Sequence, residues 1–488
     1  MLTSLVLACA DDRQPMMPAP PVAVILLPDS IALSRGDSSR LNVRVLSLDG
    51  HEIEAPVQWT SLDASIASVS NRGVVTAVDA GSTTIVASTG DLSDTTRVRV
   101  FPPVDERFIQ VSVGVGHACA LAEDGTVYCW GGNEFLEVLG RTGLLESSRP
   151  VPVAGGIRFR SVDAGAYHTC GQAIAGGVYC WGAGGLFQLG GHASSPEPIE
   201  IVAEVSFASL HVGSYFNCGL TAGGMAYCWG DDGFVTLGRG IRTGGYALDP
   251  TPVQTDLRFR LLSPGHTQTC GLAVDGRTYC WGINSGGELG TLATTEQCNT
   301  SYFVDWPCST VPIPIDGAFT FDTLDSKANH TCGLTPEGAA SCWGSGRFGE
   351  LGNGQPFSSW QPQPVVGELR FASLSAGDFY TCGLTMVGEA FCWGVNESGE
   401  LGNGSTEFDI DRPTFNPTPQ RVIGDHSFES LAAGSGNTCG ITPEGALFCW
   451  GIATNGQLGD GGSAPTQTCH IGPCSSVPVR VARPLQEG

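Results

Sequence analysis

Apolar and polar residues alternate over short stretches along this chain, and turn-forming residues separate those stretches. Few long segments show the apolar period of about 3.6 residues that marks a helix. Glycine and proline, which favour turns, number 68 and 30 among the 488 residues. A period of two between turns is typical of β-strands. The pattern therefore predicts an all-β protein.

Residues 23–100 form the first stretch of alternating strands. Leu41, Val43 and Val45 alternate with polar residues, and a hairpin turn is expected at Asp49-Gly50. Trp59 is large enough to anchor a core. These features predict a small β-sandwich over 23–100, followed by a short proline-stiffened linker at 101–106.

Residues 107–484 repeat one pattern seven times, with a period near 50 residues. Each unit has a short strand ending on glycine (RFRSVDAG at 158–165), two cysteines ten positions apart, and Trp-Gly after the second cysteine. A glycine-rich loop closing on Leu-Gly and a proline-flanked strand (RPVPV at 149–153) complete it. Four strands repeated seven times predict a seven-bladed β-propeller. Across the two cysteine strands we expect an aromatic ring to cover a glycine, as Tyr179 would cover Gly171.

The cysteine spacing fits a stapled hairpin. A three-residue loop, Glu123 to Gly125, would place Cys119 opposite Cys129 with Cα atoms about 4.5 Å apart, within reach of a disulfide. Zinc-binding cysteines usually lie two to four residues apart with a second pair nearby, so we expect disulfides and no metal. The predicted pairs are Cys119–Cys129, Cys170–Cys180, Cys218–Cys228, Cys270–Cys280, Cys298–Cys308, Cys332–Cys342, Cys382–Cys392, Cys439–Cys449 and Cys469–Cys474.

Cys9 is left over from the 19 cysteines. Val6-Leu7-Ala8-Cys9 resembles a bacterial lipobox, in which the cysteine is acylated at the new N-terminus; the alternative is an ordinary N-terminal segment with a spare thiol. Residues 1–22 are accordingly interpreted as a lipoprotein-type signal remnant and a proline-rich linker. Disulfides belong to oxidising compartments, so we expect an extracytoplasmic protein, either anchored in the bacterial cell envelope or secreted.

Two family resemblances rest on these patterns. The repeat AG-x-x-HTC-x-L-T-x-x-G-x-x-x-CWG…G-E-L-G resembles that of the regulator of chromosome condensation (RCC1) superfamily over about 107–481. The order W-T-S…I-A-S-V-S…G-V-V-T-A…G-S-T-T-I resembles the bacterial Ig-like group 2 domain. Lys327, the single lysine, departs from the repeat because it replaces the glycine of the first strand. The resemblance implies a propeller whose relatives include a guanine-nucleotide exchange factor and secreted bacterial proteins that bind other proteins, such as a β-lactamase inhibitor.

The charge balance limits the partners. Acidic residues outnumber basic residues 48 to 24, which gives a formal net charge of −24. Such a surface repels phosphate backbones and anionic membranes, so we expect no nucleic-acid partner and membrane contact only through the lipid anchor. The acidity also fits a soluble secreted protein, which we expect to be a monomer.

We expect no enzyme and no cofactor, because the sequence holds no phosphate loop, G-x-S-x-G elbow or H-E-x-x-H motif. A metal at Cys469-His470, or calcium at Asp231-Asp232 or in the loop 405–413, is an alternative without organised ligand spacing. Two functional alternatives stay open. One is nucleotide exchange by fold analogy, and the other is an extracellular enzyme with carboxylates facing each other across the channel.

Aromatic residues gather in two sets of loops. Residues two before the first cysteine, such as His117 and His168, share its face and should pack between blades. Residues three before it should lie at loop tips, where exposed aromatics on a rigid ring are typical of a face that binds a protein or glycan; the alternative is that they fill space between blades. The candidates are Tyr167, Tyr215 and Phe379 before the cysteine, and Phe135, Phe187, Phe234 and Phe348 after the tryptophan.

Overall fold

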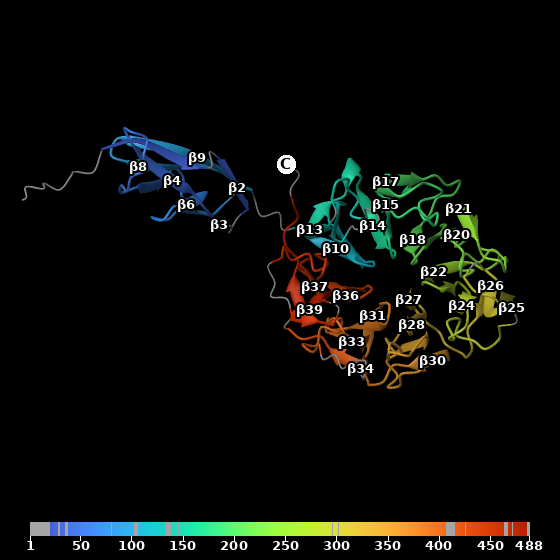
Figure 1. The fold of residues 1–488 in the computed structure, drawn as a ribbon. Helices are drawn as coiled ribbons and strands as arrows, with labels where there is room; N and C mark the ends of the chain where they lie inside the picture. The colour runs from blue at the N-terminus through green and yellow to red at the C-terminus, as the bar shows by residue number, and fades with distance from the viewer. Residues whose placement is uncertain are drawn as a thin grey trace, which may run out of the picture. The chain divides into compact units, whose positions relative to one another are not determined.

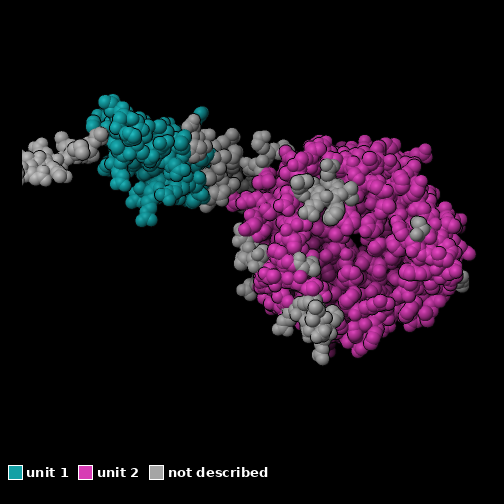
Figure 2. Space-filling view, viewed as in Figure 1, with its two compact units in different colours: residues 1–105 teal, residues 106–488 magenta. Residues whose placement is uncertain are grey.

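The computed structural model of this protein divides into two compact units, residues 1–105 and 106–488, each described by itself (Figure 2). Within the described ranges no helix is long and apolar enough to cross a membrane. The structure describes residues 20–27, 30–34, 38–79, 81–101, 106–132, 138–144, 146–294, 296–300, 302–406, 415–424, 426–462, 467–470 and 472–485.

The first unit is a set of small sheets around one apolar core. Leu41, Val75 and Ile85 are buried in it, and the Trp59 ring packs against it, as the alternation predicts. The sheets are β1 (Pro21–Leu27) with β4 (Asn42–Ser47); β2 (Ser30–Ser34), β9 (Leu92–Phe101), β8 (Gly81–Thr89) and β5 (Gln58–Ser61); and β3 (Ser38–Arg40), β7 (Val74–Ala77) and β6 (Ala67–Val69).

The second unit is a ring of seven antiparallel sheets, the blades of a propeller (Figure 1). Blades 1 to 3 are β10 (Phe108–Val113), β11 (His117–Ala122), β12 (Val127–Gly132), β13 (Glu146–Pro152); β14 (Phe159–Ala164), β15 (His168–Ala173), β16 (Val178–Gly182), β17 (Ser195–Ile201); and β18 (Ser209–Val212), β19 (Phe216–Leu220), β20 (Ala226–Asp231), β21 (Tyr246–Pro252). A single 3-10 turn, Ala154–Gly156, follows blade 1.

Blades 4 and 7 each carry a fifth, short strand, and blades 5 and 6 have four. Blades 4 and 5 are β22 (Phe259–Pro264), β23 (Gln268–Ala273), β24 (Thr278–Ile283), β26 (Trp306–Pro314), β25 (Glu296–Cys298); and β27 (Thr323–Lys327), β28 (His330–Leu334), β29 (Ala340–Gly344), β30 (Ser359–Pro364). Blades 6 and 7 are β31 (Phe371–Ala376), β32 (Tyr380–Thr385), β33 (Ala390–Val395), β34 (Phe415–Arg421); and β35 (Ser430–Ala433), β36 (Asn437–Ile441), β37 (Leu447–Ile452), β39 (Gly472–Arg480), β38 (Gln467–Cys469).

The stapled hairpin has the predicted register. Cys119 pairs with Cys129 across β11 and β12, with Cα atoms 4.1 Å apart, and Gly125 closes the turn at φ 86°. A left-handed φ of this kind strains any residue with a Cβ, which explains the glycine in each repeat. All nine predicted disulfides are present, and the two additional ones staple the short strands β25 and β38.

The prediction that the Tyr179 ring covers Gly171 is wrong, because a different ring does so. A Cβ on Gly171 would meet Phe159 Cδ1 at 2.6 Å, so the phenylalanine that opens the first strand fills this space. Tyr179 is the strand partner of Gly171, but its ring stands edge-on to Phe159 with centroids 6.3 Å apart. Tyr179 is half-buried and Phe159 fully buried.

The residues two before the first cysteine pack between blades, as predicted. His117 Nε2 lies 2.9 Å from Thr169 Oγ1 of the next blade, and His168 Nε2 lies 2.9 Å from Asn217 Oδ1. Burial lowers the pKa of His168 to about 4, so its ring is neutral at pH 7. Three residues at the same position in other blades are also buried: Phe216, His330 and Tyr380.

Among the described residues the ring closes by packing, because every strand of blades 1 and 7 pairs within its own blade. Trp130 Nε1 donates to the Gln457 carbonyl at 3.0 Å, as Trp181 Nε1 does to Val138 between consecutive blades. Beyond the last strand, the Leu485 amide donates to the Pro150 carbonyl at 2.9 Å. The closing contact therefore repeats the contact made between blades elsewhere in the ring.

Candidate functional site

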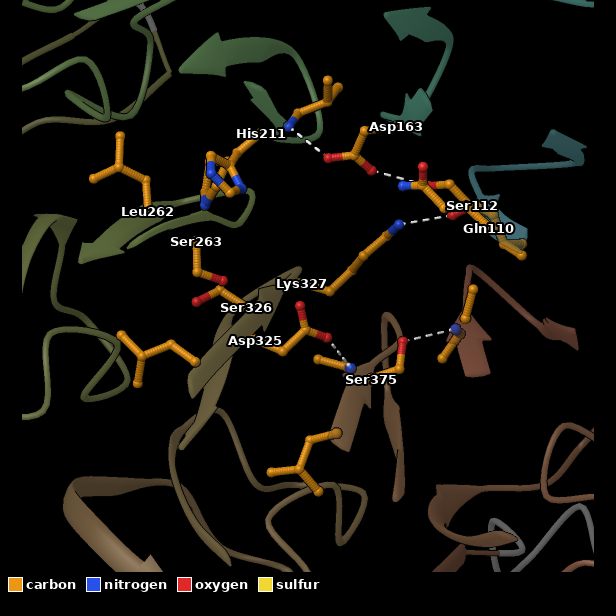
Figure 3. Close-up of a pocket in the computed structure, with 18 of the residues that line it drawn as sticks. Gln110, Ser112, Asp163, His211, Leu262, Ser263, Asp325, Ser326, Lys327 and Ser375 are labelled. Atoms are coloured by element: carbon orange, nitrogen blue, oxygen red, sulfur yellow. Dashed lines mark hydrogen bonds between the residues drawn. The ribbon is translucent and has the colours of Figure 1, made fainter. Parts of the chain in front are cut away.

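The inner strands of the seven blades enclose a central cavity of ≈ 400 Å³ (Figure 3). One residue from the middle of each inner strand contributes to its wall, and these residues differ from blade to blade. They are Ser112, Asp163, His211, Ser263, Asp325, Ser375 and Ala432.

The two channel carboxylates hold neighbouring blades together. Asp163 Oδ2 accepts the Val212 amide of the next blade at 2.8 Å, and Asp325 Oδ2 accepts the Ala376 amide at 2.6 Å. Ser112 donates to the other Asp163 oxygen at 2.9 Å. An inner strand is a sheet edge with unpaired amides, so these side chains satisfy donors that the blade itself leaves open.

Burial raises the pKa of Asp325 to about 7, and the charge of Asp163 adds to the effect, while the Ala376 amide and Lys327 oppose it. Burial also lowers the pKa of His211. Both carboxylates thus line one channel, which is the arrangement that the enzyme alternative requires. One oxygen of each, however, already accepts a backbone amide of the next blade, which assigns both side chains to the scaffold.

Lys327 also lies in the channel. Its Nζ donates to the Val113 carbonyl at 2.8 Å, which links blade 5 to blade 1 although they are not neighbours in the ring (Figure 3). The other six blades have glycine where blade 5 has Lys327; in blade 2 this glycine is Gly165. Because these glycines have no side chain, the channel has room for one long side chain. The sequence showed this residue as a departure from the repeat, but not its contact.

The two predicted sets of aromatic loops belong to one face. Consecutive antiparallel strands return to the same edge, so the turn after the first strand and the loop after the third leave a blade together. Phe348, from a loop after the tryptophan, meets Phe379, from a turn before the cysteine, at a centroid distance of 5.3 Å. The two sets are therefore parts of a single surface, which we call the aromatic face.

A stack of four rings dominates this face. Tyr302 stacks on Phe234 at 5.3 Å and 16°, Phe234 on Phe303 at 5.7 Å and 25°, and Phe303 on Trp306 at 4.9 Å and 20°. Phe234 comes from the loop after β20 of blade 3, and the other three come from the insertion of blade 4 that Cys298–Cys308 closes. The outer rings, Tyr302 and Trp306, are 54% and 42% exposed.

The four-ring stack is continuous with the turns around the channel. The His266 ring stands edge-on to Phe234 at 4.9 Å and to Tyr215 at 5.2 Å, and Tyr215 lies 6.1 Å from Tyr167. Burial lowers the pKa of His266, partly offset by the charge of Asp378, so the histidine is neutral at pH 7. The rings form one aromatic path across blades 2 to 4.

The predicted site residues differ in exposure. Phe379 is 49% exposed, and five candidates are half-buried among other rings. Phe187 stacks on Tyr246 at 4.1 Å, and Tyr246 is itself 54% exposed. Phe135 and Cys9 lie outside the described residues. The half-buried candidates are Tyr167, Tyr215, Phe187, Phe234 and Phe348.

Sequence reasoning missed three exposed rings of the face: Tyr302, Trp306 and Tyr246. A signal for the first two was present, because three aromatic residues stand between Cys298 and Cys308. A short loop with that content, held by a disulfide, cannot bury all of its rings. Tyr246 carried no comparable signal.

The three metal alternatives gain no support from the described residues. Cys469 and Cys474 form a disulfide, so they offer no thiolate beside His470. Arg239 lies 2.7 Å from Asp232 and holds that carboxylate in an ion pair. The described part of the chain contains no cluster of three ligating side chains, and much of the loop 405–413 lies outside it.

Comparison with protein families agrees with this architecture. Models of the regulator of chromosome condensation (RCC1) repeat match residues 108–135, 124–171, 337–384, 387–441 and 428–457. The bacterial Ig-like domain (group 2) matches residues 22–100. The two kinds of match fall in the two compact units.

Similar proteins share the repeat at low identity. The ultraviolet-B receptor UVR8 of Arabidopsis thaliana is 27% identical over 258 residues, 51% of this chain and 56% of that protein. Protein pim1 of Schizosaccharomyces pombe is 24% identical over 259 residues, 50% of this chain and 38% of that protein. The chain spans about half the length of the curated relatives it matches, or less.

Solved structures share the propeller. Yeast RCC1 (Prp20), bound to Kap60, has a TM-score of 0.63 at 20% identity over 74% of this chain and 85% of that chain. Human WBSCR16 has a TM-score of 0.57 at 19% identity over 71% and 91%. At such identities these likenesses concern the fold alone. The chain thus carries RCC1 repeats in a β-propeller and an N-terminal bacterial Ig-like (group 2) domain.

Proposed function

We propose that this chain is a non-catalytic binding protein whose propeller presents the aromatic face to a partner protein. The observation that carries the proposal is the four-ring stack, with exposed Tyr302 and Trp306 on a disulfide-closed insertion. Large aromatic side chains held rigidly at a surface are the residues that dominate protein interfaces. A scaffold with a disulfide in every blade supports such a face, because little side-chain or loop entropy remains to be lost on binding.

The proposed location is outside the cytoplasm, in the bacterial cell envelope or secreted. The nine disulfides support an oxidising compartment. The Ig-like domain supports the same location, and acylation of Cys9 would add a lipid anchor. In this arrangement the Ig-like domain is a spacer between the membrane and the propeller.

The two alternatives have less support. A solved structure of the related Prp20p concerns its binding to Gsp1p and histones, but at 19% identity it bears on fold alone. The enzyme alternative needs free carboxylates in the channel, and Asp163 and Asp325 are bonded to backbone amides. The experiment must therefore distinguish a protein partner from a glycan partner.

Affinity capture with the oxidised full chain tests the proposal. The test variant is Tyr302→Ala/Trp306→Ala/Phe379→Ala. The matched control, Ile174→Ala/Val274→Ala/Val387→Ala, removes three exposed apolar side chains from turns between the second and third strands, at the opposite ends of the blades. We expect a protein captured by the parent and the control and lost by the test variant. Equal capture by all three, or saturable binding only of glycans on an array, would overturn the proposal.

A further inference from the structure

The two ends of the four-ring stack present open ring faces. Tyr302 stacks on Phe234 and is 54% exposed, so much of its surface is open to solvent. Trp306 has Phe303 on one side and is 42% exposed. A planar group can stack on such a face with little rearrangement, since the ring is already held from behind.

Negative charge surrounds these rings. A Cβ on Gly233 would meet the Tyr302 ring and lie 3.1 Å from Asp231 Oδ2, so the ring edge and the carboxylate flank the same glycine. The charge of Asp231 is also the main cause that raises the pKa of the Tyr302 phenol. Burial raises the pKa of Asp231 itself to about 6. Asp305, directly before Trp306, is exposed. Asp231 thus lies beside Tyr302, and Asp305 is adjacent to Trp306 in the sequence.

No cation of the described chain balances these two carboxylates. The two arginines in the loop between β20 and β21 are already paired, Arg239 with Asp232 at 2.7 Å and Arg242 with Glu296 at 3.2 Å. No ion pair involves Asp231 or Asp305 among the described residues. The site therefore combines open aromatic faces with unbalanced negative charge, on a molecule of net charge −24.

A planar cation satisfies both features. A guanidinium group stacks on an aromatic ring and donates hydrogen bonds in its own plane to a carboxylate at the edge. A neutral sugar would use the ring but not the charge, and an anion would be repelled. We propose that the insertion of blade 4 binds an arginine side chain of the partner protein, stacked on Trp306 or Tyr302 and paired with Asp305 or Asp231. This deepens the proposed function and rests on it.

The probe is N-acetyl-arginine methylamide, compared with the citrulline analogue, which has nearly the same shape and no charge. Fluorine NMR of the full chain labelled with 5-fluorotryptophan reports binding, and a Trp306→Phe variant assigns the Trp306 signal. At constant ionic strength we expect a saturable shift of that signal with the arginine compound, with a dissociation constant on the order of millimolar, and none with citrulline.

Asp305→Asn and Asp231→Asn should each weaken this binding by about three- to tenfold. Asp249→Asn, which removes the same charge from an exposed position on β21, should leave it unchanged. Equal response to arginine and citrulline, a response to neutral oligosaccharide instead, or no effect of either carboxylate variant would overturn the inference. A protein that needs Tyr302 and Trp306 for capture, without arginine selectivity in the NMR titration, would leave the proposed function standing and remove only this inference.

Discussion

The ammonium group of Lys327 on blade 5 donates a hydrogen bond to the carbonyl oxygen of Val113 on blade 1, 2.8 Å away across the central channel. The bond joins two strands that are 214 residues apart in sequence. It uses a position at which the other six blades have glycine. The chain's single lysine thus braces the ring from inside.

Replacing this lysine should loosen the ring moderately. Lys327→Met keeps most of the side chain but removes the charged hydrogen bond, and we expect a loss of about 1–2 kcal/mol in the free energy of unfolding. Lys327→Gly restores the repeat pattern and should lose at least as much. Urea unfolding followed by tryptophan fluorescence measures both. Stability equal to the parent in both variants would show that the bond across the channel contributes nothing.

Glu400 should make the propeller less stable as pH rises. It is buried in a loop where Ser398 donates its amide to Glu400 Oε2 at 2.8 Å, as Asn455 donates to Gln457 in blade 7. Burial raises the pKa of Glu400 to about 7, above its value of 4.5 in the unfolded chain. Because the folded state holds the proton more tightly, the contribution of Glu400 to stability is fully present below about pH 4.5 and is lost as the pH rises through about 7.

Glu400→Gln should therefore match the parent near pH 4 and exceed it by about 1–3 kcal/mol near pH 8. Gln457→Glu, the reverse change at the equivalent position, should destabilise the protein at pH 8 more than at pH 4. Thermal unfolding at the two pH values provides the comparison. Parallel pH profiles for the parent and Glu400→Gln would contradict the assignment.

The Cys298–Cys308 disulfide should matter for binding more than for the propeller. It staples an insertion outside the four repeated strands, whereas Cys119–Cys129 joins two strands within a blade. Both pairs are ten residues apart, so the loop-entropy model allows about 2–3 kcal/mol for each. An insertion can open locally while the blades stay folded, so replacing each pair with serine should lower the midpoint of thermal unfolding much more for Cys119/Cys129. We expect the Cys298/Cys308 variant to keep its midpoint within a few degrees but lose partner capture. A large loss of thermal stability in that variant would show that the insertion belongs to the scaffold.

A methyl group at Gly171 should clash with the ring that covers it. Its Cβ would lie 2.6 Å from Phe159 Cδ1, in a fully buried site, so Gly171→Ala should destabilise the protein by about 1–3 kcal/mol. Blade 1 has Ala120 at the same position, and Ala120→Gly, the opposite change, should cost no more than about 1 kcal/mol. Denaturant unfolding of the two variants checks the pair. A neutral Gly171→Ala would mean that Phe159 moves aside without cost.

Local features of this protein could be predicted from the sequence because they depend on spacing along one strand pair. The interval from Cys119 to Cys129, with Gly125 in the turn, determines a hairpin register and hence a disulfide. Repetition of that unit was enough to predict seven blades. Alternation alone also placed His117 and His168 on the buried side.

Contacts between blades depend on the closed ring and could not be predicted in this way. Even within one blade, no period in the sequence distinguishes the Phe159 ring, which covers Gly171, from that of Tyr179. The sequence showed Lys327 only as a departure from the repeat, because its partner Val113 lies 214 residues earlier, on a blade that is not a neighbour of blade 5. Hairpin spacing within each repeat determined the scaffold. The stacking of Phe234 on Tyr302, from different blades, was decided by ring closure, which brings side chains together without any fixed sequence interval.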